Sequence, residues 1–309
     1  MKNDDLGNRM KTYYEEVSKT KLTRRMPVII RLDGKAFHTF TRGFKRPFDE
    51  LFMKTMQATM KYLCENIQGC VLGYTQSDEI TLVLVDYNKL NTSAWFDYEV
   101  QKMASISASM ATLAFNRYFA ENVENSGYGL TSCWIDACTE EMKKLYYAYN
   151  KSLEKGALFD SRVFNIPKEE VVNCLLWRQL DAERNSILAI GQANFSHKEL
   201  QNKSCKDIMN MLEAEGIVWG EYPTTLKRGS CCIKKAYFID TKGEYVIDLD
   251  DTYTDPEGRG IYRKIDDKEI GTCGSENDTL RIRSHWIIDN EIPRFINEGR
   301  EYIEKLIKY

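Results

Sequence analysis

Histidine is scarce in this sequence, with only His38, His197 and His285 among 309 residues. None of the nine cysteines forms a Cys-x-x-Cys pair, so the sequence has no clustered zinc ligands. Few histidines are available for a Ser-His-Asp triad. Because the cysteine count is odd and the residues are scattered, we expect reduced, mostly buried thiols and not a disulfide framework. Chemistry based on carboxylates and a hard metal ion remains open.

Long apolar runs are also missing. No stretch approaches the roughly 20 residues of a membrane helix, and the N-terminus from Met1 to Asp5 is charged, so we expect a cytoplasmic protein without a membrane partner. The sequence contains neither a Gly-Lys-[Ser/Thr] P-loop nor a Gly-x-Gly-x-x-Gly signature, which argues against those phosphate cradles. The net charge of −3 means that binding of a polyanion requires a local positive potential.

The order of apolar patterns indicates an α+β fold. Strands are predicted at 27–33, 70–74, 80–85 and 158–164, and helices at 49–66, 97–119 and 171–191. The order strand, helix, strand, strand, helix, strand is that of a split β-α-β unit, a ferredoxin-like antiparallel sheet with helices on one face. A C-terminal α+β extension follows, with a hairpin at 231–249, a loop-rich stretch at 258–274 and a terminal helix at 292–309.

Two carboxylates lie at the ends of predicted strands in this pattern. Asp33-Gly34 ends the first strand, and Asp78 follows Ser77 at the tip of a hairpin. Each acid alone is explained by a turn, since Asp-Gly is a common turn signal. Together, with the Gly34 carbonyl, they supply oxygen ligands for Mg²⁺, and two such ions about 3.5–4 Å apart are able to clamp a phosphoryl displacement. The pairing favours the functional interpretation.

Basic residues follow the first acid, where a triphosphate would have to be neutralised. They are Lys35, His38, Lys45 and Arg46, and lysine and arginine both suit phosphate oxygens. The alternatives are a solvated basic loop and, for His38, a satisfied and partly buried histidine between two phenylalanines. Ser77 is either a turn hydroxyl or a phosphate ligand.

Two weaker sets occur later in the chain. Trp177-Arg178-Gln179 and the polar residues after it form a helical face whose simplest explanation is exposure to solvent. Lys227-Arg228-Gly229 is a phosphate-contacting loop or a basic turn. With Arg24, Arg25, Arg31 and Lys35, these residues would form a discontinuous cationic track.

Several spaced blocks between residues 28 and 229 resemble the tRNA-His guanylyltransferase family of 3′–5′ polymerases. The blocks are Arg31-Leu32-Asp33-Gly34-Lys35 with Phe37-His38, Phe44-Lys45-Arg46-Pro47, Gln76-Ser77-Asp78-Glu79, Phe159-Asp160-Ser161-Arg162-Val163, Trp177-Arg178-Gln179 and Tyr222-Pro223 through Gly229. They recur in the family's order, which makes the resemblance specific. Beyond Gly229 no block is recognised.

The resemblance implies a nucleotidyltransferase with a polymerase-type palm at 1–195, an insertion at 127–155 and a C-terminal region at 196–309 packed on the palm. It implies two Mg²⁺ ions, GTP and ATP as substrates, tRNA as the acceptor of nucleotides at its 5′ end, and a homotetramer. The implied catalytic residues are Asp33, Asp78 and Glu79, and the implied metal ligands are Asp33, Gly34 and Asp78. The implied nucleotide-binding residues are Asp33, Gly34, Lys35, Ala36, Phe37, His38, Lys45, Arg46, Ser77 and Asp78, and the tRNA-binding residues are Arg31, Arg178, Lys227 and Arg228.

Two departures from the family pattern bear on the substrate. Eukaryotic members carry His-Ile-Asn-Asn-Leu-Tyr-Asn where this chain has residues 183–189, Glu-Arg-Asn-Ser-Ile-Leu-Ala. This places the chain with the "like protein" branch, for which the implied task is templated repair of truncated tRNA 5′ ends. The loop between Phe40 and Pro47 is one residue short, so Lys45 and Arg46 compete for one role.

Two other functions are compatible with the same residues. A nucleotide cyclase would use the same palm and the same two acids to close a nucleoside triphosphate on itself. A non-catalytic RNA- or nucleotide-binding module would use the acids only as turn residues. The basic blocks that face tRNA in the family favour nucleotide addition to tRNA.

Overall fold

The computed structural model of the chain describes residues 5–128, 138–239, 245–248, 252–254, 261–265, 268–272 and 281–308. Side chains in the C-terminal part are described up to residue 235 and again from residue 284. The chain divides into two compact units, unit 1 at Met1–Cys232 with Asp289–Tyr309 and unit 2 at Ile233–Ile288. None of the helices in these described ranges is long and apolar enough to cross a membrane.

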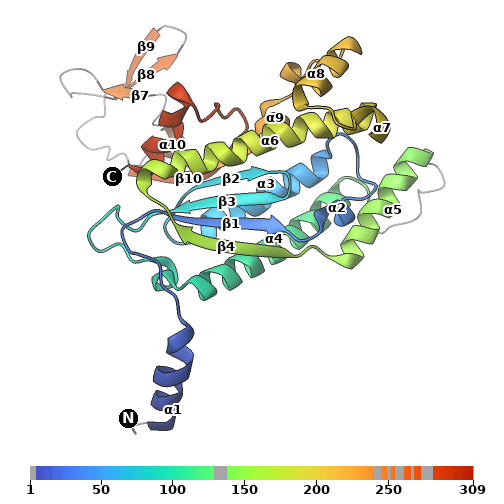
Figure 1. Ribbon diagram of the computed structural model, residues 1–309. Coiled ribbons are helices and arrows are strands. Elements are labelled where there is room, and N and C mark those ends of the chain that lie inside the picture. The colour runs from blue at the N-terminus through green and yellow to red at the C-terminus, as the bar shows by residue number, and fades with distance from the viewer. Residues whose placement is uncertain are drawn as a thin grey trace. The chain divides into compact units, whose positions relative to one another are not determined.

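Unit 1 is built on an antiparallel sheet (Figure 1). Its strands are β1 (Val28–Gly34), β2 (Cys70–Gln76), β3 (Glu79–Leu84) and β4 (Phe159–Asn165), and they are neighbours in the order β2-β3-β1-β4. Strand β5 (Ser230–Ile239), which begins in unit 1, lies next to β2. The predicted split β-α-β order and the α+β class are confirmed.

Two long helices cover one face of this sheet. They are α3 (Glu50–Asn66), which packs on β2, and α4 (Val100–Asn125), which packs on β4 and β1. Asp49 caps α3 by accepting a hydrogen bond from the N–H of Phe52 at 2.9 Å. A third long helix, α6 (Val171–Asn194), crosses the opposite face (Figure 1). The sheet is therefore covered by α3 and α4 on one side and by α6 on the other.

Shorter elements complete both units. Those of unit 1 are α1 (Asp5–Met10), η1 (Lys11–Glu15), η2 (Glu16–Ser18), α2 (Phe37–Phe40), η3 (Trp95–Tyr98), α5 (Glu140–Lys155), η5 (Lys168–Glu170), α7 (His197–Leu200), α8 (Cys205–Ala214), η6 (Trp219–Glu221), α9 (Thr224–Arg228), η8 (Asn297–Gly299) and α10 (Arg300–Ile307). Those of unit 2 are β6 (Tyr245–Asp248), β7 (Thr252–Thr254), β8 (Ile261–Ile265), β9 (Lys268–Thr272) and most of β10 (Arg281–Asp289).

The sequence predictions for the C-terminal region are partly confirmed. Strands β5 and β6 pair antiparallel as the predicted hairpin, and its turn at 240–243 lies outside the described residues. The stretch 258–274 was expected to be loop-rich, but β8 pairs with both β7 and β9 there. Strands this short are stabilised by hydrogen bonds to one another. The apolar runs between the glycines are too short to predict such strands from the sequence.

The terminal helix is shorter than predicted. It was expected from residue 292, but α10 begins at Arg300. The side chain of Gln179 on α6 donates to the carbonyl of Pro293 and accepts from the N–H of Phe295, both at 2.9 Å. Residues 292–296 are thus held in a non-helical path by α6, and Asn297 has a positive φ of 50° that a continuous helix excludes.

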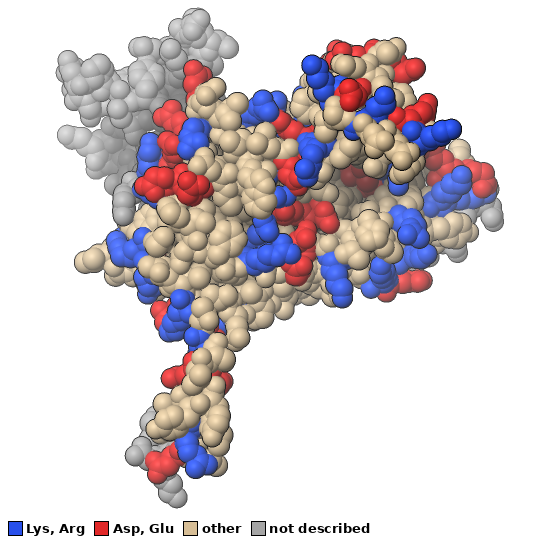
Figure 2. Space-filling model, in the orientation of Figure 1, with Lys and Arg blue, Asp and Glu red and all other residues tan. Residues whose placement is uncertain are grey.

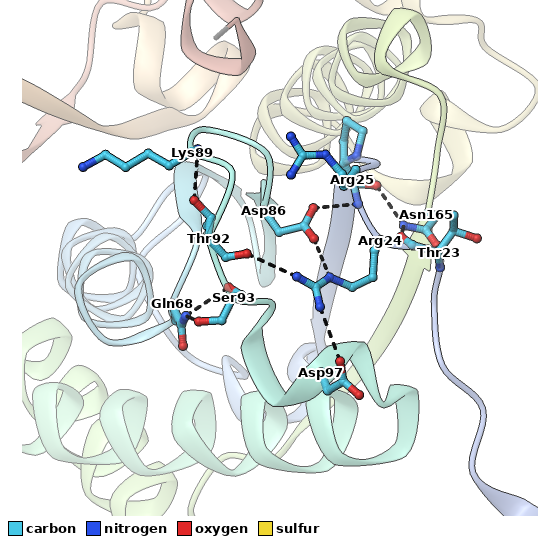
Figure 3. Close-up of polar contacts among 11 residues, drawn as sticks. Thr23, Arg24, Arg25, Gln68, Asp86, Lys89, Thr92, Ser93, Asp97 and Asn165 are labelled. Carbon is cyan, nitrogen blue, oxygen red and sulfur yellow. Dashed lines mark hydrogen bonds and ion pairs between the residues drawn. The ribbon is translucent and has the colours of Figure 1, made fainter.

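The basic segment before β1 is fixed by one buried carboxylate (Figure 3). Asp86, 1% exposed, accepts from Nε of Arg24 at 2.6 Å and from the N–H of Arg25 at 2.8 Å. Arg24 also donates to the carbonyl of Thr92 at 3.2 Å and lies 3.5 Å from the carboxylate of Asp97. The guanidinium of Arg24 therefore meets acceptors of its own chain, which interrupts the predicted cationic track.

We predict that Asp86→Ala lowers the melting temperature on the order of 5 °C, because the N–H of Arg25 loses a charged acceptor inside the protein. The matched variant Asp97→Asn removes the charge of an exposed partner of the same arginine, tolerates the positive φ of 51° at this position and should leave the melting temperature nearly unchanged. Calorimetry on both variants measures the difference. Equal shifts would contradict the anchoring role of Asp86.

Candidate active site

The strand register aligns acidic residues in one row across the sheet. Asp33 is the Cα partner of Glu79 on β3 and of Asp160 on β4, and Glu79 is the partner of Gln76 on β2. Directly opposite residues of antiparallel strands point to the same face of the sheet. Glu79 forms an ion pair with Arg178 of α6, at 2.7 Å from Nε to Oε1, so the row lies on the α6 face.

A row of cationic residues lies two positions further into the sheet. Arg31 on β1 is opposite Thr81 on β3 and Arg162 on β4. Because side chains alternate along a strand, Arg31 shares the α6 face with Asp33. Carboxylates thus stand at the edge of the sheet, with guanidinium groups directly behind them.

The hairpin between β2 and β3 brings Asp78 to the end of β1. The backbone carbonyl of Asp78 accepts from the N–H of Gly34 at 3.1 Å, and the hydroxyl of Ser77 donates to the Asp78 carboxylate at 3.1 Å. Burial raises the pKa of the Asp78 carboxyl, and the negative charge of Asp33 raises it further. The structure therefore places Asp33 and Asp78 close enough to repel each other.

The donor set fits a hard divalent cation. No group of three or more His, Cys, Asp or Glu side chains within the described ranges is arranged to hold a metal ion. The Asp33 carboxylate forms no hydrogen bond or ion pair with any other residue that the structure describes. Two carboxylates and the Gly34 carbonyl leave coordination positions for water and phosphate oxygens, which is the environment that Mg²⁺ prefers. The residues present therefore suit Mg²⁺ bound together with a nucleotide.

Glycine is required where β1 ends. A Cβ on Gly34 would lie 2.3 Å from the ring of Phe37. Phe37 and Phe40 are buried with ring centroids 5.1 Å apart, and they anchor the one-turn helix α2 in an aromatic cluster. His38, between them, is exposed, and its ring nitrogen lies 3.0 Å from the hydroxyl of Thr39. Of the two explanations for His38, the buried one is wrong.

A cavity of about 560 Å³ adjoins the hairpin tip. Its polar lining includes His38, Lys45, Arg46, Gln76, Ser77, Asn185 and Ser186, and its apolar lining includes Phe44, Phe48, Phe52, Met53, Met56, Ala182 and Ala189. A mostly apolar cavity of this size with a few polar groups is typical of a small-molecule site. Gln76 and Ser77 belong to both the cavity wall and the hairpin that carries Asp78, so the cavity opens beside the two acids.

Asp49 holds the loop that carries Lys45 and Arg46. Its carboxylate accepts from the N–H of Lys45 at 3.0 Å and from the hydroxyl of Tyr149 on α5 at 2.7 Å. Burial and the bond to Asp49 raise the pKa of Tyr149. Part of the stretch predicted as an insertion therefore supports a wall of the cavity. The side chains of Lys45 and Arg46 are both exposed along that wall, so both remain candidates for a triphosphate contact.

Glu79 and Arg178 form a buried ion pair beside Asp33. Arg178, 8% exposed, also donates to the carboxylate of Asp181 at 2.7 Å. Burial raises the pKa of Glu79, and the guanidinium of Arg178 opposes that rise. Arg178 was predicted to contact tRNA, but its charge is already shared by two carboxylates of the chain.

Lys227 and Arg228, two other predicted tRNA contacts, also meet internal partners. The ammonium of Lys227 donates to the carbonyl of Gly220 and lies 5.6 Å from the ring centroid of Trp219. Nε of Arg228 donates to the carboxylate of Glu183 at 2.8 Å. Contact of these side chains with tRNA stays a prediction. On the face of the molecule drawn in Figure 2, Lys and Arg are interspersed with Asp and Glu over the described residues, without a continuous cationic patch.

The face of α6 expected to be exposed contains buried residues that local sequence does not reveal. Gln179 is fully buried, and Glu183 accepts from Arg228 and also from Arg294 at 2.8 and 3.0 Å. These arginines are 45 and 111 residues away from Glu183 in the sequence. A single carboxylate thus ties α9 and the C-terminal segment to α6, and only a conserved pattern in several sequences would have signalled it.

Similar sequences are found in one described family and among uncharacterized proteins. Residues 7–167 match the sequence model of a family described as tRNAHis guanylyltransferase. An uncharacterized protein of Acanthamoeba polyphaga mimivirus is 27% identical over 263 residues, which are 79% of this chain and 82% of that protein. The tRNA(His) guanylyltransferase of Eremothecium gossypii is 23% identical over 227 residues, covering 70% of this chain and 83% of that enzyme.

Solved structures agree with these matches. A bacterial tRNA(His) guanylyltransferase-like protein in complex with ATP has a TM-score of 0.69 and 34% identity, covering 98% of this chain and 99% of that one. A structure of such a bacterial protein in complex with GTP has a TM-score of 0.67 and 33% identity, covering 99% of this chain and 100% of that one. The likeness therefore extends over nearly the whole chain.

We predict that Arg178→Met destabilises the protein by about 3–5 kcal/mol, because the charge of Glu79 is left buried without a partner. The double variant Arg178→Met/Glu79→Gln removes both charges and should recover most of that loss. Urea unfolding of wild type, both single variants and the double variant gives the coupling free energy.

A suitable control is Arg184→Met, which removes an exposed arginine from the same helix and should change the unfolding free energy by about 0.5 kcal/mol or less. If the double variant is as unstable as Arg178→Met, the buried pair does not explain the role of Arg178.

Proposed function

This chain belongs to the tRNA(His) guanylyltransferase family, and we propose on that basis that it is a nucleotidyltransferase that adds nucleotides to the 5′ end of tRNA in the 3′–5′ direction. One observation carries the proposal: Asp33 and Asp78 meet at a sheet edge beside a cavity large enough for a nucleotide. A turn role for each acid does not account for their mutual repulsion, whereas a bound cation does.

Two Mg²⁺ ions are part of the proposal, with Asp33, the Gly34 carbonyl and Asp78 as the residues that would hold them. When bound, such ions stabilise the charge that develops on transferring phosphoryl groups. The chain's own contribution is to hold both carboxylates in place, Asp33 at the end of β1 and Asp78 on the hairpin whose carbonyl accepts from the N–H of Gly34. Because Arg178 already compensates Glu79, the uncompensated negative charge is concentrated on Asp33 and Asp78.

The nucleotide would occupy the cavity with its phosphates toward the hairpin tip. His38, Ser77, Lys45 and Arg46 line that part and supply donors and positive charge. The residues from Asp33 to His38 connect the acids to this wall. Complexes of bacterial guanylyltransferase-like proteins with ATP and with GTP support both nucleotides as substrates.

The proposed reaction has two stages. ATP activates a 5′-monophosphorylated tRNA by adenylylation, and the 3′-hydroxyl of an incoming GTP or other nucleotide then attacks the activated phosphate and displaces AMP. Pyrophosphate is the leaving group of the first stage, released when the bond between the α- and β-phosphates of ATP breaks. The protein's part is positioning and charge stabilisation, since phosphoryl transfer leaves little covalent work for side chains. A cytoplasmic location and a homotetramer are further parts of this proposal.

We further propose that the chain acts in the "like protein" branch, on truncated tRNA 5′ ends. Identity to the bacterial like protein is 34%, against 23% to the fungal guanylyltransferase. The segment 183–189, in which the chain departs from the eukaryotic pattern, contributes Asn185, Ser186 and Ala189 to the cavity wall. The departure is therefore located where a nucleotide would be selected.

We expect purified protein with Mg²⁺, ATP and all four nucleotides to restore a tRNA that lacks its first 5′ nucleotide, whichever base stands opposite the gap. Sequencing of the products measures which nucleotide is added. Addition of G alone, irrespective of the opposing base, would contradict templated repair, and cyclic nucleotides formed without RNA would indicate a cyclase.

In the same assay Asp78→Ala should reduce addition by several orders of magnitude, because one of two metal-holding carboxylates is lost. Glu65→Gln, an exposed acid on α3, is the matched control and should keep wild-type activity. Circular dichroism checks that both variants fold. Activity retained by Asp78→Ala overturns the metal assignment.

Lys45→Ala should raise the KM for ATP and GTP about 10- to 100-fold, because a charge-assisted hydrogen bond to phosphate is lost. Arg46→Ala should change KM less, since Asp49 fixes the backbone of Lys45 and not that of Arg46. Steady-state kinetics on both variants decides between them. A larger effect of Arg46→Ala would assign the triphosphate contact to Arg46.

A further inference from the structure

An exposed tryptophan lies beside the acidic row. Trp177 on α6 is 54% exposed. The guanidinium carbon of Arg178 lies 4.3 Å from its ring centroid, and that of Arg31 lies 5.2 Å away. A cation within about 6 Å of an aromatic ring centroid is attracted to it. The indole is thus held by two cations while much of it stays open to solvent.

Both cations also border the candidate active site. Arg31 precedes Asp33 by two residues on the same face of β1, and Arg178 forms the buried ion pair with Glu79. The position of the indole is therefore coupled to the carboxylate row through two independent elements, a strand and a helix. A ligand on the open part of Trp177 would lie next to the site of chemistry.

The side chain of Arg31 contains a buried hydrogen-bond donor without an acceptor among the described residues, which is a second indication of a ligand site. Its Nε is buried, and in the part of the chain that the structure describes it has no hydrogen-bond partner. Buried donors without acceptors are rare because they are costly. Arg31 as a whole is only half-buried, so its guanidinium is suited to a phosphate, which accepts charge-assisted hydrogen bonds from it.

The exposed surface continues along α6 from Trp177. Leu180 and Arg184 follow at spacings of three and seven residues, which places them on the same side of the helix, and both are exposed. Apolar and cationic side chains therefore share this side of the helix, where Arg184 also donates to the carboxylate of Asp181. This composition matches a polyanion with stacked rings, namely RNA, better than an apolar protein surface.

We propose that Trp177 is a platform on which a nucleobase at the reacting end of the RNA substrate stacks, with Arg31 bound to the adjoining backbone phosphate. The inference rests on the proposed function, because it specifies how the RNA of that reaction is held. Stacking is sequence-tolerant, since every base has a flat face. The platform therefore positions the 5′ end for Asp33 and Asp78 without selecting a base.

The test compares Trp177→Ala, Trp177→Phe and Trp177→Leu for affinity to a 5′-truncated tRNA, measured by fluorescence anisotropy in the absence of nucleotide. Loss of stacking should weaken binding about 5- to 100-fold in the Ala and Leu variants. Trp177→Phe should stay within about threefold of wild type, because an aromatic face remains. Leu113→Ala, which changes an exposed apolar residue of α4, is the control and should bind tRNA as wild type does.

A second measurement separates stacking from a structural role. The KM for ATP should be unchanged in all four variants, since Trp177 does not line the nucleotide cavity. If Trp177→Leu binds tRNA as well as Trp177→Phe, or if the affinity of Trp177→Ala equals that of wild type, the platform is excluded. Parallel loss of ATP and tRNA binding in Trp177→Ala would mean that the indole only supports Arg31 and Arg178, which also overturns the inference.

The proposed function is tested separately, by measuring nucleotide addition to tRNA by the wild-type protein. If wild-type protein adds no nucleotide to any tRNA, the proposed function fails. If wild type is active and the Trp177 variants bind tRNA normally, only the platform fails. A variant series that binds tRNA normally but loses binding to a second protein would assign the exposed surface to a protein partner and would likewise exclude the platform.

Discussion

The antiparallel pairing of β1 with β3 and β4 is the constraint on which the site depends. Ile30 and Leu32 point into the core under α3 and α4, so the alternating residues Arg31 and Asp33 point toward α6. A slip of one residue would turn the acid into the aromatic core and the leucine outward. The apolar residues that stabilise the sheet therefore also determine where the charges stand.

The charges at this edge are balanced only in part. Asp33, Asp78 and Glu79 lie near one another, and Arg178 compensates Glu79 through a buried ion pair. Removal of carboxylates from water without compensation is unfavourable, which is why burial and the charge of Asp33 raise the pKa of Asp78. This repulsion lies at a position where a bound cation would relieve it. Such incomplete compensation is common at functional sites.

Distant segments hold the walls of the cavity. Tyr149 of α5 reaches Asp49, which orders the backbone of Lys45. On the opposite wall, Gly229 approaches β2 so closely that a Cβ would lie 2.2 Å from the carbonyl of Thr75. These contacts join parts of the chain that are 100 and 154 residues apart in sequence. The cavity therefore depends on tertiary contacts and not on a single motif.

Local patterns were sufficient for the palm and its acids. The strand and helix periods predicted β1 to β4 and the helices between them, and the resemblance of spaced blocks led to the family. Burial could not be derived in the same way, because Arg178, Gln179 and Lys227 look like solvent-exposed residues in a polar segment. Their partners come from strands and loops far along the chain. The sequence by itself determined that two carboxylates, Asp33 and Asp78, stand where strands of the sheet end, since side-chain type and strand position decide it. Only the tertiary structure decided which cations remain available to a substrate, because ion pairing depends on neighbours that the chain brings together when it folds.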